Sequence, residues 1–187
     1  MLKVTNILIV GVGGQGTILA SNVVSYAAMN AGLDVKKSEI HGMSQRGGSV
    51  FSHVRFGKTV SSPVIPLGEV DVLISLEEME TARWLDYLNK DSKVIILTNR
   101  IFPANVTVYP EGIVSEISAK LTNTIAIDPK KYTEKLGNEK FLNIFLLGVL
   151  SKFIQIPDDC WNKAIKSLVP EGTFDKNLEA FNAGKNY

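Results

Sequence analysis

The stretch from Asn6 to Gly32 constrains the fold of this chain more than any other. It begins with the apolar run Ile7–Val10, continues through four glycines within six residues, and ends in a long helical pattern. A short β-branched run bounded by glycine predicts a buried strand of a parallel sheet. The glycines permit a tight turn and let backbone N–H groups come close to a ligand or a partner. We therefore expect an α/β fold that opens with a strand, a glycine turn and a helix.

The turn has the Gly-x-Gly-x-x-Gly spacing that dinucleotide-binding proteins place between their first strand and helix. Its candidate ligand- or partner-facing residues are Gly11, Gly13, Gly14, Gln15 and Gly16. Two interpretations stay open, because such a turn either binds an anion at the helix N-terminus or only lets the helix pack on the sheet. A dinucleotide site also needs an acidic residue at the end of the second strand, and Glu39 stands there.

Length and charge exclude several classes of function. The chain has 187 residues, which is enough for one domain with its own core and too few for two ordinary ones. Its 20 basic and 19 acidic residues leave a net charge of +1, which gives no support for nucleic-acid binding. The apolar runs are shorter than a membrane span and the N-terminus lacks a signal-peptide pattern, so we expect a cytoplasmic protein.

Cysteine and histidine are scarce, and this limits the chemistry that the chain can perform alone. Cys160 is the one cysteine, and a single thiol cannot form an intrachain disulfide, hold an iron–sulfur cluster or build a structural zinc site. A helix start can lower the pKa of a thiol, but a buried cysteine beside Trp161 is the simpler interpretation. The two histidines, His41 and His53, are too few for a multi-histidine metal site. We expect no metal site in this chain.

A second glycine-bearing loop follows the second predicted strand, Leu33–Ile40. It carries more polar chemistry than a simple connection needs, because a glycine pair can form an anion nest and a guanidinium suits phosphate or carboxylate. The candidate ligand- or partner-facing residues in this loop are Ser44, Gln45, Arg46, Gly47 and Gly48. We expect no catalytic residue in the chain unless His41 or Arg46 serves as one.

The pattern changes to strict alternation after this loop. Residues 50–56 place apolar side chains on one face, which together with Phe56-Gly57-Lys58 predicts a β-hairpin that turns at these three residues. His53 stands in the middle of the first strand of this hairpin, where a histidine is expected to be a packing residue.

Further along the chain, apolar runs alternate with helical patterns. The predicted strands are 70–75, 93–98 and 124–127, with an option for a short strand at 105–109. The predicted helices are 76–88, 112–121, 130–136, 141–154 and 157–168. Glu77 and Glu78 fall in a first helical turn, where negative charge complements the helix dipole. This order predicts a single-domain, Rossmann-like doubly wound α/β fold with a mostly parallel sheet, an added β-hairpin and a C-terminal helical extension.

Two C-terminal segments are unusual. The helix at 141–154 is almost entirely apolar, so it is either buried all round or covered by another chain. The last segment, 173–187, is polar and weakly helical, and we expect this tail either to contact a partner or to fray. The domain itself is predicted to span residues 1–172.

Three segments together resemble one known family. They are GVGGQG at 11–16, HGMSQRGGSV at 41–50 and LGNEKFLNIFLLGVL at 136–150. In combination they are similar to the gamma-type subunit or domain of 2-oxoacid:ferredoxin oxidoreductases, and above all to the small subunits of the indolepyruvate-directed members. The resemblance covers essentially the whole chain, and the loop at 41–57 is its most specific part.

The resemblance implies a heteromeric complex in which a large partner subunit binds thiamine diphosphate with Mg²⁺ and decarboxylates an arylpyruvate. Electrons would pass through 4Fe–4S clusters on the partner to ferredoxin, and the acyl group would pass to coenzyme A. This chain would hold none of these cofactors alone, and without its partner it would be inactive and able to self-associate. Its two glycine loops would face the partner's active site, where they either help to enclose the intermediate or the coenzyme A phosphates or only shape the subunit interface.

Other classes of function stay open. A free-standing dinucleotide-binding protein would place Glu39 on the ribose, although the polar loop after it and the lack of a second catalytic domain disfavour this. The adenylating enzymes of ubiquitin-like activation also use a Gly-x-Gly-Gly-x-Gly turn, but they commonly carry paired zinc cysteines and a reactive cysteine that this chain lacks. A scaffold without a ligand of its own is compatible with the subunit interpretation.

Overall fold

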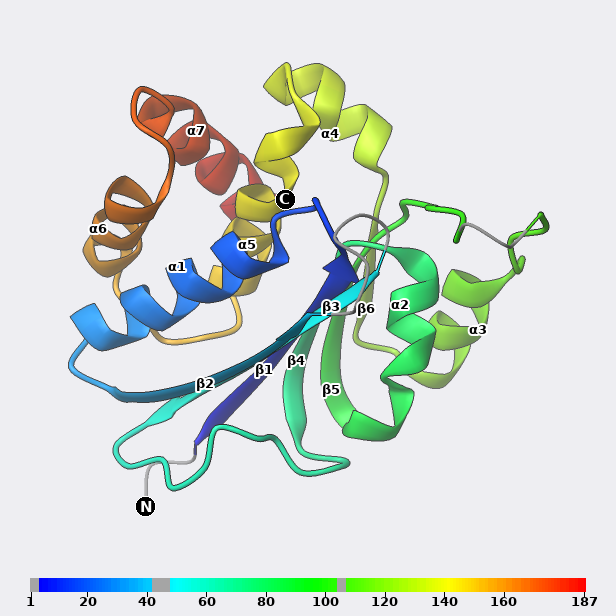
Figure 1. Ribbon diagram of the computed structural model, residues 1–187, viewed down its shortest axis with the longest axis horizontal. Coiled ribbons are helices and arrows are strands. Elements are labelled where there is room, and N and C mark those ends of the chain that lie inside the picture. The colour runs from blue at the N-terminus through cyan, green and yellow to red at the C-terminus, as the bar shows by residue number, and fades with distance from the viewer. Residues whose placement is uncertain (1–3, 42–47, 104–106) are drawn as a thin grey trace.

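The computed structural model describes residues 4–41, 48–103 and 107–187 of the chain. In these ranges a six-stranded sheet lies between two layers of helices (Figure 1). The strands are β1 (Thr5–Val12), β2 (Asp34–His41), β3 (Ser49–Gly57), β4 (Val70–Ser75), β5 (Leu88–Leu97) and β6 (Thr124–Ile127). The helices are α1 (Thr17–Asn30), α2 (Glu78–Arg83), α3 (Ile113–Lys120), α4 (Pro129–Leu136), α5 (Leu142–Ser151), α6 (Asp158–Leu168) and α7 (Phe174–Lys185), with short 3₁₀ turns η1 (Leu85–Tyr87) and η2 (Glu139–Phe141).

The strand order is β2-β3-β1-β4-β5-β6. Strands β1, β4, β5 and β6 pair in parallel, while β3 runs antiparallel to both β1 and β2. The α/β class and the mostly parallel sheet predicted from the sequence are confirmed.

The hairpin predicted to turn at Phe56-Gly57-Lys58 is wrong. Strand β3 continues to Gly57 and pairs on both edges, with Ser52 opposite Ile9 of β1 on one side and Glu39 of β2 on the other. The antiparallel pair is formed instead by β2 and β3, joined through residues 42–48. Alternation predicts a strand, but it carries no information about which neighbours satisfy the two edges of that strand.

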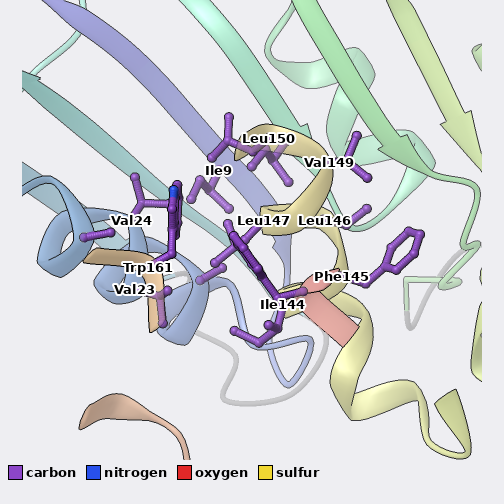
Figure 2. Close-up of a cluster of buried hydrophobic side chains, with 14 of the residues drawn as sticks. Ile9, Val23, Val24, Ile144, Phe145, Leu146, Leu147, Val149, Leu150 and Trp161 are labelled. Atoms are coloured by element: carbon purple, nitrogen blue, oxygen red, sulfur yellow. The ribbon is translucent and has the colours of Figure 1, made fainter. Parts of the chain in front are cut away.

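The two faces of the sheet carry separate cores. Helices α1, α5, α6 and α7 cover one face, and α2 and α3 cover the other. Helix α5 is buried over Leu142–Leu150, so the all-round burial predicted for it is confirmed within this chain. Figure 2 shows its side chains packed between Ile9 of β1, Val23 of α1 and Trp161 of α6.

The C-terminal segment does not fray, which was one of the two outcomes expected for it. Residues 174–185 form α7, which packs on α5 with Phe181 only 1% exposed. Close approach comes from Gly148 on α5 and Gly184 on α7, where the backbones of the two helices meet. Glycine contacts bury backbone rather than large side chains, so a count of apolar residues underestimates this packing. Contact of the segment with a partner stays a prediction.

Several predicted boundaries differ from the structure by one to three residues, and the largest differences are in α2 and β5. The predicted helix 76–88 is shorter, because α2 ends at Arg83 and β5 already begins at Leu88. The optional strand at 105–109 falls partly outside the described residues, and residues 107–109 are not a strand. Among the residues that the structure describes, no helix has both the length and the apolarity needed to cross a membrane.

Candidate functional site

The glycine turn lies at the carboxyl edge of the sheet, between the end of β1 and the start of α1 (Figure 1). Strands β1 and β4 are neighbours here, and the helices that follow them, α1 and α2, cover opposite faces. In open α/β sheets this reversal of winding opens a crevice at the strand ends, which is where such folds place their ligands.

Packing alone explains two of the glycines in the turn. A Cβ atom at Gly11 would lie 2.9 Å from Oε1 of Gln15 and 3.2 Å from Cβ of Leu76. Gly16 has a φ of +81°, and a Cβ atom there would collide with the side-chain amide of Asn143 on α5. Gly14 has a φ of +101° and open space around its Cβ position. The turn therefore packs α1 and α5 together at one end and is open at the other.

Gln15 holds the turn in shape with its side chain. Its Oε1 accepts a hydrogen bond from the backbone N–H of Val12 at 2.7 Å, and its Nε2 donates to the carbonyl of Leu76 at 2.6 Å. Because both ends of the amide are engaged, the side chain joins β1 to the end of β4.

The second glycine loop meets the first at Gly48. The N–H of Gly13 donates to the carbonyl of Gly48 at 2.9 Å. The structure thus brings together one residue from each of the two loops that the sequence singled out. The remaining candidates of the second loop, Ser44, Gln45, Arg46 and Gly47, lie outside the described residues, as does the side chain of His41.

A groove follows the carboxyl edge of the sheet beside the glycine turn. One hollow of about 460 Å³ borders the turn. A second hollow of about 560 Å³ extends the groove past the ends of β5 and β6. The two share Asn99, Glu139 and Leu142. The other polar lining groups include Gly13, Gly14, Gln15, Lys140, Arg100 and Lys130. The lining also carries the carboxylates Asp128, Glu134 and Glu139, so its charges are mixed. The N–H groups of Gly13 and Gln15 already donate to Gly48 and Val12, and an anion here would be bound mainly by the lysine side chains.

Three carboxylates at the start of α2 are buried beside this groove. Glu77 caps the helix by accepting the N–H of Glu80 at 2.9 Å, which confirms the structural role expected for it at a helix start. Its other oxygen accepts from the N–H of Ile101 at 3.1 Å and from the hydroxyl of Tyr109. Burial, followed by the hydrogen bond to Glu77, raises the pKa of Tyr109. Glu77 therefore fixes the segment after β5 over the start of α2.

Glu78 and Glu80 each pair with a different neighbour. Glu78 accepts from Nε of Arg100 at 3.0 Å. Glu80 accepts from the hydroxyl of Ser49 at 2.5 Å and pairs with Arg83 at 3.1 Å. Burial raises the pKa of Glu80, and the Ser49 hydrogen bond and Arg83 oppose this shift. Sequence reasoning missed Glu80, since its partner Ser49 is 31 residues away and only the order of strands brings the two together.

Glu39 does not stand where a dinucleotide site needs it. Strand β3 separates β2 from β1, so Glu39 lies opposite Ser52 and two strands away from the glycine turn. Adjacent strands are about 4.8 Å apart, so this insertion moves the carboxylate by about one further strand spacing. Glu39 is also engaged by Nζ of Lys37 at 2.7 Å. The structure therefore gives no support to a ribose contact from this residue.

His53 and Cys160 are packing residues, as expected. His53 is 4% exposed, and its Nδ1 accepts the N–H of Ile65 at 3.2 Å within a cluster of aromatic rings. The thiol of Cys160 is buried, and burial followed by Asp159 raises its pKa, which makes it less reactive. Within the described ranges, no group of three or more histidine, cysteine, aspartate or glutamate residues could hold a metal ion.

We expect His53 to make the protein sensitive to acid. Burial, and then the charge of Arg55, lower the pKa of His53 below its ordinary 6.5, so the folded protein keeps it neutral. As the pH falls below 6.5, His53 takes up a proton in the unfolded chain but not in the folded one. The free energy of unfolding therefore decreases until the pH reaches the lower pKa that His53 has in the folded protein. Denaturant unfolding measures the free energy of unfolding at about pH 7 and about pH 5. Between these two pH values it should fall less in His53→Gln than in the wild type, and glutamine keeps an acceptor for the N–H of Ile65. An equal loss in both proteins would contradict this.

A family model and a curated relative both match this chain along nearly its full length. Residues 6–187 match the family model described as pyruvate ferredoxin/flavodoxin oxidoreductase. The chain is 39% identical to indolepyruvate oxidoreductase subunit IorB of Archaeoglobus fulgidus, over 97% of this chain and 94% of that protein.

Solved structures share the fold. The gamma subunit of a keto/oxoacid ferredoxin oxidoreductase from Geobacter sulfurreducens matches with a TM-score of 0.73 and 24% identity, over 97% of this chain and 96% of that one. The 2-oxoglutarate:ferredoxin oxidoreductase from Magnetococcus marinus, with 2-oxoglutarate, coenzyme A and succinyl-CoA bound, matches with a TM-score of 0.75 and 19% identity. The match covers 98% of this chain and 31% of that longer chain, so the same fold forms about a third of the longer chain.

Proposed function

The chain belongs to the pyruvate ferredoxin/flavodoxin oxidoreductase family, and from this premise we propose that it is the small subunit of a 2-oxoacid:ferredoxin oxidoreductase. The observation that carries the proposal is the match to a subunit of an indolepyruvate oxidoreductase along nearly the full length of both chains. A relative of this length and identity supports the same role for this chain, that of a subunit in a larger enzyme. The substrate class we propose is the arylpyruvates, with indolepyruvate as the first member to test.

The cofactors of the reaction belong to a larger partner subunit in this proposal. When bound there, thiamine diphosphate with Mg²⁺ supplies decarboxylation, and 4Fe–4S clusters carry the electrons to ferredoxin. This chain fits such a partner rather than the cofactors themselves, because its one cysteine is buried and cluster ligation by protein needs several thiolates. The contribution of the small subunit is then to complete and enclose the site.

The carboxyl edge of the sheet is the surface that we assign to this task. Gly13 and Gly48 join the two glycine loops there, and the adjoining groove presents the ammonium groups of Lys140 and Lys130. Such a surface suits the phosphates of coenzyme A. Arg46 would add a guanidinium from the second loop, since a planar fork of N–H donors binds a phosphate group bidentately.

The test is Arg46→Ala in the complex with the large subunit. We expect KM for coenzyme A to rise about 10- to 100-fold, because a hydrogen bond to a charged group contributes about 1.5–3 kcal/mol. Arg46→Lys should fall between the wild type and Arg46→Ala, since it keeps the charge and loses the bidentate geometry. If assembly and coenzyme A dependence are both unchanged in Arg46→Ala, the assignment of the loop to the phosphates fails.

A further inference from the structure

The first turn of α2 connects the segments that border the groove. The carbonyl of Leu76, just before the turn, accepts from the side chain of Gln15 in the first glycine loop. Glu77 holds the segment after β5 through the N–H of Ile101. Glu80 holds the end of the second glycine loop through Ser49. One short helical turn thus contacts three segments that are far apart in the sequence.

The Glu80–Ser49 contact joins α2 to the end of the second glycine loop. Glu80 is 5% exposed, and its Oε2 lies 2.5 Å from the hydroxyl of Ser49. Its Oε1 faces Nε of Arg83 at 3.1 Å, and the Arg83 side chain is 56% exposed. The carboxylate therefore has one partner inside the protein and one at the surface.

Ser49 transmits this contact to both glycine loops. It is the first residue of β3 and follows Gly48 directly. The carbonyl of Gly48 accepts from the N–H of Gly13 at 2.9 Å. The chain of contacts runs from Glu80 through Ser49 and Gly48 to Gly13, which lines the groove.

Stability alone does not call for a carboxylate at this position. Burying a carboxylate costs free energy even when it is paired, and an apolar side chain of similar volume is often at least as stabilising. The α2 helix also has its own cap in Glu77, so Glu80 is not needed to begin the helix. What distinguishes Glu80 from an apolar residue is the hydrogen bond that it accepts from the Ser49 hydroxyl at the loop junction.

We propose that Glu80 is a positioning residue which acts through Ser49 to hold Gly48 against Gly13 for the reaction of the assembled complex. This inference rests on the proposed function, because it assigns a purpose to the loop surface described there. Glu80 touches neither substrate nor cofactor in this account. Its effect is transmitted by the Ser49 hydroxyl. Substitutions that remove or keep a hydroxyl at residue 49 therefore test the proposal.

The first measurement uses the full chain without its partner. Hydrogen exchange of the Gly13 amide is followed in the wild type, Ser49→Ala, Glu80→Leu and the double variant, since leucine has no acceptor for the Ser49 hydroxyl. We expect exchange to be about tenfold faster in both single variants and no faster still in the double variant, because a single contact is lost in all three. Arg83→Gln removes the surface partner of the same carboxylate and should leave the exchange unchanged. Wild-type exchange in both single variants would overturn the proposal.

The second measurement uses the complex with the large subunit. Ser49→Ala and Glu80→Leu should raise KM for coenzyme A about tenfold while kcat falls by less than about twofold, and Ser49→Thr should keep the wild-type KM. Faster Gly13 exchange with an unchanged KM would overturn the positioning role. An inactive wild-type complex would refute the proposed function, whereas the exchange data still decide whether Glu80 holds the loops together.

Discussion

Replacing Gly148 with alanine is expected to destabilise the protein by about 3 kcal/mol, even though alanine is the better helix former by about 1 kcal/mol. A Cβ atom at Gly148 would lie 2.8 Å from the backbone nitrogen of Lys185 and closer still to the carbonyl oxygen of Phe181. Both of these atoms belong to the backbone of α7, so no side-chain rotation can make room. The two helices would have to separate, and this would disturb the packing of Phe181 and Phe145.

Gly184 faces the same contact from the other helix. A Cβ atom there would lie 2.9 Å from the carbonyl carbon of Phe145 and 3.1 Å from Cα of Gly148. Gly184→Ala should therefore cost about as much as Gly148→Ala, and the double variant should cost less than the sum because one separation relieves both clashes.

Denaturant unfolding of the full chain measures both effects. Glu179→Ala is the matched control on α7, since it removes only an exposed ion pair with Lys176, and it should change the unfolding free energy by less than about 0.5 kcal/mol. A loss below about 1 kcal/mol in Gly148→Ala would contradict the close packing of α5 on α7.

Local patterns predicted those parts of the fold that depend on local physics. The strands at 70–75 and 124–127 were predicted to the residue, because short apolar runs between helices are typical of buried parallel strands. The partners of β3 were not predicted, since they depend on edges that meet only in the folded sheet. Helix α7 was underestimated because its packing uses glycine backbone, which carries no hydrophobic signal.

For the candidate site too, the sequence identified the features that depend on local pattern and missed those that depend on distant contacts. The two glycine loops could be identified from their residues, and both lead to the same edge of the sheet through Gly13 and Gly48. The roles of Gln15 and Glu80 could not be seen, because each depends on a side-chain contact to a distant element. Glu39 stands at the predicted strand end, but the insertion of β3 beside it removes the geometry on which the dinucleotide interpretation depended.

The largest effect on activity that we expect is its dependence on assembly. This chain and the large subunit from the same organism should each be inactive alone in reducing ferredoxin with a 2-oxoacid and coenzyme A. Together they should be active, because a chain with one buried cysteine cannot ligate the clusters that we propose for the complex. Indolepyruvate should be turned over with a higher kcat/KM than pyruvate or 2-oxoglutarate.

The measurement that tests the subunit assignment most directly is ferredoxin reduction by the separate and combined subunits. Titration of the isolated chain with NAD(H) is its control, and this should show no binding, because Glu39 is held by Lys37 two strands from the glycine turn. We predict indolepyruvate- and coenzyme A-dependent reduction that appears only when both subunits are present. Full activity of the large subunit without this chain, or stoichiometric NAD(H) binding by this chain alone, would contradict the account.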